Sequence, residues 1–176
     1  RFKILIEANA FPSDDYAVQS QIRYHGYDVK DSLIEMKPRE NEDTIRTEDI
    51  EAMIEKEGDS IALIWFAGVN YYTGHAFNFE KIVKAGHRKG CIVGFDLAHA
   101  TGNLELKLHD WNVDFAVWCN YKYMSGGPGT SAGLYINKKH FAMDPGLTGW
   151  FGNTKSTQFQ LKHQYEHSND ADGWLT

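Results

Sequence analysis

The sequence predicts an α/β protein with a mostly parallel sheet covered by helices on both faces. Apolar runs of strand length alternate with longer segments of helical period, which is the pattern of repeated strand–helix–strand units. The run 60–66 is apolar after its first residue, as expected for a central strand buried on both faces. The chain has 176 residues, 42% of them hydrophobic, so we expect one core belonging to a single domain or to part of one.

The first elements follow from apolar runs and their punctuation. A strand is expected at 2–8, and a helix at 13–25, because Pro12-Ser13-Asp14-Asp15 offers an N-cap with first-turn acids and Gly26 offers a stop. A short strand at 32–36 leads into the polar segment 37–41, which we interpret as a surface loop.

The clearest predicted helix begins at Thr47. Two acids follow Thr47 directly, as in a capped first turn. Ile50, Met53 and Ile54 then form an i, i+3, i+4 apolar stripe that ends near Gly58.

The strand–helix rhythm continues through the second half of the chain. The strand 60–66 runs into a turn over 68–74, and a helix is expected at 78–89 with Gly90 as its stop. Three further strands are predicted, at 91–95, 113–119 and 131–137.

Composition excludes several classes of function. The 18 Lys and Arg against 24 Asp and Glu give a net charge of -6, so no basic surface for nucleic acid is expected. No apolar run reaches the roughly 18 residues that span a bilayer, and no signal-peptide pattern opens the chain. Cys91 and Cys119 lie in strand-like runs and are expected to be small buried side chains in a reducing compartment, which favours a cytoplasmic location. The chain opens directly in a strand-like run, and it resembles a segment of a longer protein.

Ligands of open α/β sheets bind beyond the carboxyl ends of the strands. Asp96 ends a predicted apolar strand, where a carboxylate is costly unless it meets a cation or a donor. His99 follows three residues later. A helix N-cap or ion pair for Asp96 and a core histidine for His99 are the simpler alternatives, but the two together at one strand end favour a site.

Lys122 is the candidate nucleophile. It follows the predicted strand 113–119, lies between Tyr121 and Tyr123, and precedes the glycine-rich bend 125–129. Partial desolvation at such a place lowers the pKa of an amine and favours Schiff-base chemistry. The alternative is an ordinary surface lysine. The spacing does not match a phosphate-binding loop, so nucleoside triphosphate hydrolysis is disfavoured.

Two aromatic segments are further candidates. Phe11-Pro12-Ser13-Asp14 offers an aromatic face and a carboxylate where the first strand meets its helix, although a hydrophobic staple explains it equally simply. Gly149-Trp150-Phe151-Gly152 suits a loop over a ligand or a subunit interface, or simple packing.

Other common sites are unsupported. The histidines show no paired spacing with a helix-borne Glu, so no metal site is predicted. The Gly-x-Gly-x-x-Gly motif of dinucleotide binding does not follow the first predicted strand.

The order of Asp96-Leu97-Ala98-His99 and Asn120-Tyr121-Lys122-Tyr123 resembles fold-type I pyridoxal-phosphate enzymes, the aspartate aminotransferase-like group. Longer motifs make the chain similar to the kynureninase family within that group: 11–14, 37–39, 55–60, 93–100, 108–111 and 149–152. The resemblance covers essentially the whole chain and only the middle of the family's chain. It implies a segment of the large cofactor-binding domain, without the family's N-terminal part and C-terminal small domain.

The resemblance implies a role for each site residue. Phe11 would stack on the pyridine ring, with Pro12, Ser13 and Asp14 beside the cofactor, and Asp96 would keep the ring nitrogen protonated next to His99. Lys122 would carry the cofactor as an internal aldimine and move protons. Tyr121 would bond the phosphate and is a candidate general acid, and Trp150 would reach the phosphate across a homodimer interface.

The implied reaction is hydrolytic cleavage of the Cβ–Cγ bond of L-kynurenine or 3-hydroxykynurenine, which yields alanine and an anthranilate in tryptophan catabolism and NAD biosynthesis. Ala67 stands where family members often have a hydroxyl, so one phosphate contact is in doubt. Two alternatives stay open: another fold-type I activity, such as a cysteine desulfurase or an aminotransferase, and a non-catalytic α/β module.

Overall fold

The structure is a computed structural model that describes residues 1–176, and it divides them into two compact units, Arg1–Leu134 and Tyr135–Thr176. The first unit contains the strands and helices of the alternating pattern: β1 (Lys3–Glu7), α1 (Pro12–Tyr24), α2 (Val29–Ser32), β2 (Leu33–Met36), α3 (Thr47–Glu57), β3 (Ile61–Ala67), α4 (Phe79–Arg88), β4 (Ile92–Asp96) and β5 (Phe115–Cys119). Strand β6 (Ala132–Ile136) crosses the boundary between the units. The second unit otherwise holds short helices: η1 (Lys138–His140), η2 (Trp150–Gly152), α5 (Lys155–Gln158) and η3 (Ala171–Trp174).

The sheet has six strands in the order β2-β1-β3-β4-β5-β6. Strand β1 pairs in parallel with β2 and β3, β3 pairs in parallel with β4, and β4 with β5. The predicted α/β class with a mostly parallel sheet is therefore confirmed, and each predicted strand lies within about two residues of its expected bounds.

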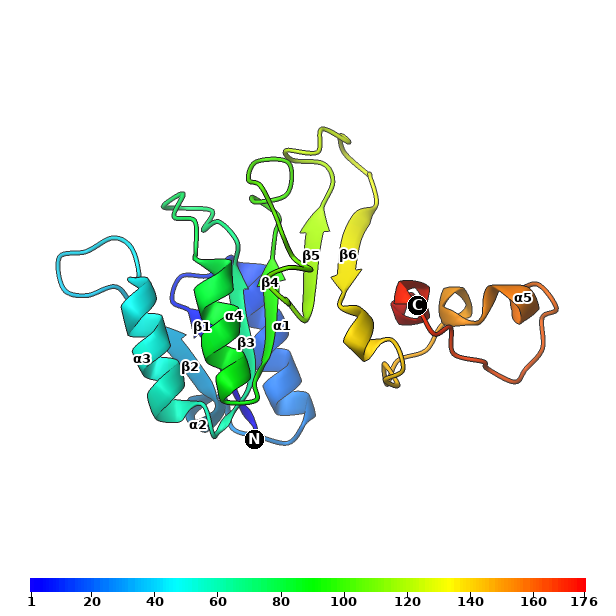
Figure 1. The fold of residues 1–176 in the computed structure, drawn as a ribbon, viewed down its shortest axis with the longest axis horizontal. Coiled ribbons are helices and arrows are strands. Elements are labelled where there is room, and N and C mark those ends of the chain that lie inside the picture. The colour runs from blue at the N-terminus through cyan, green and yellow to red at the C-terminus, as the bar shows by residue number, and fades with distance from the viewer. The chain divides into compact units, whose positions relative to one another are not determined.

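Helices cover both faces of the sheet, with α3 and α4 on one face and α1 on the other (Figure 1). Helix α1 packs through Val18 and Ile22 against Ile6 of β1. Helix α4 approaches closely at Gly86, where an added Cβ would lie 2.6 Å from Val93 Cγ2 and 2.8 Å from Ile64 Cδ1. This layering leaves the carboxyl ends of the parallel strands together at one edge.

Two predicted helix caps are wrong. The N-cap positions of α1 and α3 are Phe11 and Arg46, and neither provides a side-chain cap. Pro12 and Thr47 are already helical, so the Thr47 hydroxyl does not occupy the N-cap position from which it could bond the next turn. The predicted first-turn acids are present, and Asn78 caps α4 by accepting a bond from Lys81 N.

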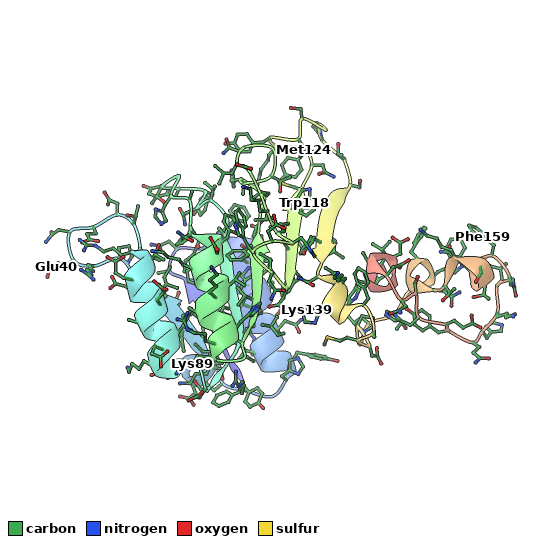
Figure 2. All side chains as sticks on the ribbon, in the orientation of Figure 1. Glu40, Lys89, Trp118, Met124, Lys139 and Phe159 are labelled. Carbon is green, nitrogen blue, oxygen red and sulfur yellow. The ribbon has the colours of Figure 1, made fainter.

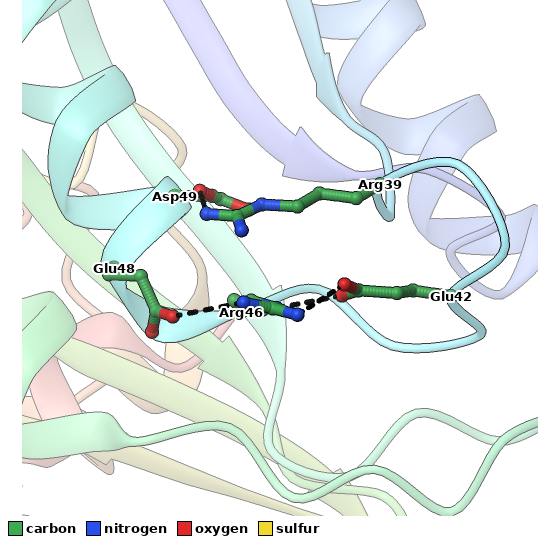
Figure 3. A network of polar contacts seen from close by, with 5 residues as sticks. All are labelled: Arg39, Glu42, Arg46, Glu48 and Asp49. Carbon is green, nitrogen blue, oxygen red and sulfur yellow. Dashed lines mark hydrogen bonds and ion pairs between the residues drawn. The ribbon is translucent and has the colours of Figure 1, made fainter.

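The segment 37–41 is a loop, as predicted, and charge pairs hold it to the start of α3 (Figure 3). Arg39 donates to both carboxylate oxygens of Asp49, at 2.8 and 2.7 Å. Arg46 donates to both oxygens of Glu42 and lies 3.9 Å from Glu48. These pairs are exposed, so they orient the loop more than they stabilise the fold.

Cys91 is buried, as predicted, and Cys119 is half-buried; both are free thiols. None of the helices combines the length and the apolar composition needed to span a membrane.

Candidate functional site

Three carboxyl groups lie close together at the carboxyl edge of the sheet. Glu7 ends β1, Asp96 ends β4, and Asp14 is in the first turn of α1. Asp14 lies close enough to Asp96 and Trp65 for both side chains to shift its pKa, and Asp96 Oδ1 accepts from Ala98 N at 2.8 Å. The parallel register brings these groups together, because adjacent parallel strands end at the same edge.

The environment of these acids favours a positively charged partner. Burial, then the charge of Asp96, raises the pKa of Asp14 to about 7. Burial also raises the pKa of Glu7 to about 7, against hydrogen bonds from Asn70 and Ala67 that lower it. No cation is among the groups that shift either pKa. The negative charge of these acids is therefore neutralised only when they bind protons or a cationic hydrogen-bond donor. The three acids are not arranged as metal ligands.

Lys122 lies beside an aromatic face. Its Nζ is 5.8 Å from the centroid of the Phe11 ring and 5.5 Å from that of Tyr121. Phe11 is 45% exposed, so a flat ligand can reach its ring. The predicted grouping of an aromatic ring and an amine at this edge is therefore present.

His99 is half-buried in the turn after β4. Burial, then the nearby charge of Lys122, lowers the pKa of His99, which favours the neutral imidazole. Its ring centroid is 6.0 Å from that of Tyr123. His99 and Lys122 thus share one electrostatic environment.

The turn after β5 is held by its own hydrogen bonds. Gly126 N donates to Asn120 O at 2.8 Å, and Ser125 N donates to Lys122 O at 2.9 Å. Asn120 Oδ1 accepts from the Trp118 indole at 2.9 Å. In Figure 2 the labelled Trp118 and Met124 mark the ends of the segment that carries Lys122. The glycine-rich bend therefore orders the backbone on which the amine is placed.

Trp150 belongs to the second compact unit. Its indole nitrogen donates to Gln158 O at 3.0 Å, and Gln158 Nε2 donates back to Trp150 O at 3.0 Å. Phe159, labelled in Figure 2, packs edge-on against the indole with ring centroids 5.2 Å apart. The predicted contact of Trp150 with a phosphate stays a prediction.

The sequence did not point to Glu7, Asn70 and Tyr71. Asn70 bonds Glu7, and Tyr71 packs edge-on against Phe11 with ring centroids 5.3 Å apart. One signal was available: Glu7 is an acid that directly follows the apolar run Ile4-Leu5-Ile6. The other two residues stand in a polar turn that many surface loops resemble.

A hollow of about 550 Å³ lies between α1 and the sheet, away from the strand ends. It is mainly apolar, with Trp65 and Phe115 in its wall. Asp14 is the only acid that lines it. The hollow therefore adjoins the candidate site at the edge of the sheet only through Asp14 and Trp65.

Comparison with known proteins identifies the family. Residues 3–169 match the aminotransferase class-V family. The chain belongs to the aminotransferase class-V family. Among solved structures, the cysteine desulfurase of Thermococcus onnurineus NA1 has a TM-score of 0.71 at 17% identity, over 99% of this chain and 40% of that one. The ureidoglycine-glyoxylate aminotransferase of Bacillus subtilis has a TM-score of 0.63 at 19% identity, over 79% and 33%. These two likenesses show the fold alone.

Curated relatives are much closer in sequence. The chain is 55% identical to the kynureninase of Mus musculus over 99% of its length and 38% of that protein. It is 51% identical to the kynureninase of Flavobacterium psychrophilum over 99% of its length and 41% of that protein. The resemblance to the kynureninase family is confirmed, and the chain spans about two fifths of the relatives it matches.

This aminotransferase class-V family and these relatives imply dependence on pyridoxal phosphate. The residues present fit that cofactor. A protonated pyridine nitrogen is the cationic donor that the neighbouring acids Asp14 and Asp96 lack, and the exposed ring of Phe11 offers a stacking face. The Lys122 amine is within reach of that same face.

Proposed function

We propose that this chain is the cofactor-binding core of a kynureninase. Such an enzyme would hydrolyse the Cβ–Cγ bond of L-kynurenine or 3-hydroxykynurenine, a carbon–carbon bond in a ketonic substrate, and release alanine and an anthranilate. The observation that carries the proposal is identity above 50% to kynureninases over 99% of the chain. The position of the Lys122 amine 5.8 Å from the centroid of the Phe11 ring supports it.

Pyridoxal phosphate, when bound, supplies a conjugated ring that accepts electrons from bonds broken beside the substrate's amine. Asp96 would accept a hydrogen bond from the ring nitrogen and keep it protonated, with Asp14 as its neighbour. Phe11 would stack on one side of the ring, and His99 would hydrogen-bond beside it as a neutral imidazole. Pro12 and Ser13 begin α1 beside this position.

Lys122 would hold the cofactor covalently through Nζ and, once substrate displaces it, carry the substrate's α-proton on the same atom. The Tyr121 hydroxyl would donate to the phosphate and is the candidate acid that would protonate Cβ once the Cβ–Cγ bond is broken. Tyr121 is 52% exposed, so its hydroxyl is accessible to both. Trp150 would contact the phosphate from the partner in a homodimer.

Further parts of the proposal concern the whole protein. Both compact units would belong to the large cofactor-binding domain, and the protein would act in the cytoplasm on a small amino-acid substrate. Neither a nucleic acid nor a membrane is a proposed partner. The net charge of -6 supports the first of these two statements.

The test uses the full-length protein, a Lys122→Ala variant and a Lys107→Ala control, which removes an exposed lysine that pairs with Glu105. Each protein is incubated with pyridoxal phosphate and 3-hydroxykynurenine, and released alanine is quantified. We expect alanine from the wild type and the control but not from Lys122→Ala. Borohydride reduction followed by peptide mass spectrometry should leave a pyridoxyl group on Lys122.

The other outcomes separate the alternatives. A pyridoxyl group on Lys122 without alanine would reject kynureninase activity and favour a desulfurase or an aminotransferase. No pyridoxyl group and no visible absorption would favour a non-catalytic module.

A further inference from the structure

Glu7 is a buried acid that the proposed reaction does not use. It is 1% exposed, and both of its oxygens accept hydrogen bonds from the end of β3 and the turn that follows. Glu7 Oε2 accepts from Ala67 N at 3.2 Å, and Glu7 Oε1 accepts from Asn70 Nδ2 at 3.0 Å. A buried carboxyl that receives two donors from one segment fixes the path of that segment.

The orientation of the Asn70 amide is determined by its other contacts. Asn70 Oδ1 accepts from Tyr72 N and Thr73 N, both at 3.0 Å, and from Thr73 Oγ1 at 3.2 Å. Because the amide oxygen is occupied by its own turn, the amide nitrogen must face Glu7. Position 7 must therefore offer two acceptors.

The turn that Asn70 organises is closed by its backbone. Asn70 N donates to His75 O at 2.9 Å, and Phe77 N donates to Gly68 O at 3.1 Å. Tyr71 stands in this turn and packs edge-on against Phe11. Lys122 Nζ lies over the Phe11 ring, 5.8 Å from its centroid. Contacts therefore run without a break from the buried Glu7 carboxyl to the ring beside the proposed cofactor.

We infer that Glu7 is a positioning residue of the cofactor site: through Asn70 it holds the turn 68–77 so that Tyr71 supports Phe11 against the cofactor ring. The inference rests on the proposed binding of pyridoxal phosphate. It assigns no chemical step to Glu7, because Glu7 hydrogen-bonds Ala67 and Asn70 and reaches Phe11 only through them. The charge of Glu7 also raises the pKa of Asp14, and the double variant described below keeps one carboxylate at this place.

Exchange of the two polar groups tests the inference in the full-length protein. Glu7→Gln directs an amide nitrogen at the Asn70 nitrogen, and Asn70→Asp directs a carboxylate at Glu7, so either change breaks the contact. The double variant Glu7→Gln with Asn70→Asp restores it with donor and acceptor exchanged, since the amide oxygen introduced at position 7 would still accept from Ala67 N. Glu35→Gln is the matched control, because it removes an exposed carboxylate from neighbouring β2.

The measurements are the Kd for pyridoxal phosphate and the visible circular dichroism of the bound cofactor, which reports the orientation of its ring. We expect each single variant to raise Kd about tenfold and change the dichroism, as the loss of a buried polar contact predicts. The double variant should return Kd to within about threefold of the wild type, and the control should match the wild type.

A second variant covers the case in which the single variants fold poorly. Tyr71→Ala removes a 43% exposed ring and none of the hydrogen bonds described above, so the melting temperature of the apoprotein should change little. Kd should still rise and the dichroism should change.

The outcomes are distinguishable. Failure of the wild type to bind pyridoxal phosphate would reject the proposed function before any variant is considered. Tight binding by the wild type with an unchanged Kd in Glu7→Gln or in Tyr71→Ala would overturn the inference, as would a double variant no better than the singles.

Discussion

The raised pKa of Glu7 predicts how the stability of the apoprotein depends on pH. Burial raises this pKa from 4.5 to about 7, so the folded state binds a proton on Glu7 more tightly than the unfolded state does. This contribution to stability is fully present below pH 4.5, decreases as pH rises, and is lost once pH passes about 7. The acids that face Glu7 act in the same direction, since the charge of Asp96 raises its pKa further.

The magnitude follows from the two values. Each pKa unit is worth about 1.4 kcal/mol, so the difference between 4.5 and about 7 corresponds to roughly 3 kcal/mol between pH 4 and pH 9. Glu7→Gln cannot titrate and removes this part of the pH dependence. The variant also breaks the Asn70 contact, but that loss lowers stability at every pH and leaves the slope unaffected.

The assay is urea unfolding of the apoprotein at five pH values from 5 to 9, for the wild type and for Glu7→Gln. We expect the wild type to lose stability relative to the variant as pH rises from 5 to 7, and the difference to become constant above about pH 8. Asp14→Asn removes the second acid whose pKa is raised. A variant that combines Glu7→Gln with Asp14→Asn should therefore show the smallest dependence of the free energy of unfolding on pH. Parallel curves for the wild type and Glu7→Gln would refute the reasoning, because Glu7 would then titrate alike in both states.

Three other substitutions test packing, capping and the cofactor contact. Gly94→Ala places a Cβ 2.4 Å from the Phe115 ring and should lower the free energy of unfolding by about 1–3 kcal/mol in a denaturant titration, whereas no loss would mean that the ring moves freely. Asn78→Ala removes the cap that Lys81 N uses and should cost ~1 kcal/mol, with Asn78→Asp retaining most of the stability. Ala67→Ser supplies the hydroxyl that the resemblance to the family leads us to expect at this position. It should tighten pyridoxal phosphate binding about tenfold, measured by spectroscopic titration, because a hydrogen bond to a charged group is worth about 1.5–3 kcal/mol. An unchanged Kd would show that the phosphate does not contact this position.

The fold was predictable because its signals are local. The apolar run 60–66 and the punctuation at Gly26, Gly58 and Gly90 placed β3 and the helix ends without knowledge of any tertiary contact. Asp96 and Lys122 were candidates for a similar reason: Asp96 ends β4, and Lys122 lies in the turn after β5. The caps failed because a threonine or an acid before an apolar stripe indicates a helix start only to within one residue, and capping depends on which residue stays outside the helix.

The support of the site was not predictable in the same way. Glu7 and Asn70 are 63 residues apart, and only the pairing of β1 with β3 brings them together. Tyr71 contacts Phe11 because the turn after β3 folds toward the start of α1, a direction that no periodicity encodes. Residue types at strand ends therefore predicted a candidate site, whereas the contacts that orient those residues required the structure.

The acids at the carboxyl edge have opposite effects on folding and on binding. Without a cation, burying Glu7, Asp14 and Asp96 together costs stability at neutral pH, as the raised pKa values of the first two show. A cationic ring nitrogen bonded to Asp96 would lower the negative charge of the same cluster. Its binding would therefore be favoured most at the pH values at which the apoprotein is least stable. An ion pair within the protein would have lowered that cost, but a carboxylate already paired with an arginine, as Asp49 is with Arg39, has less affinity for a ligand's cation. The unneutralised cluster therefore supports the proposed binding of a positively charged group.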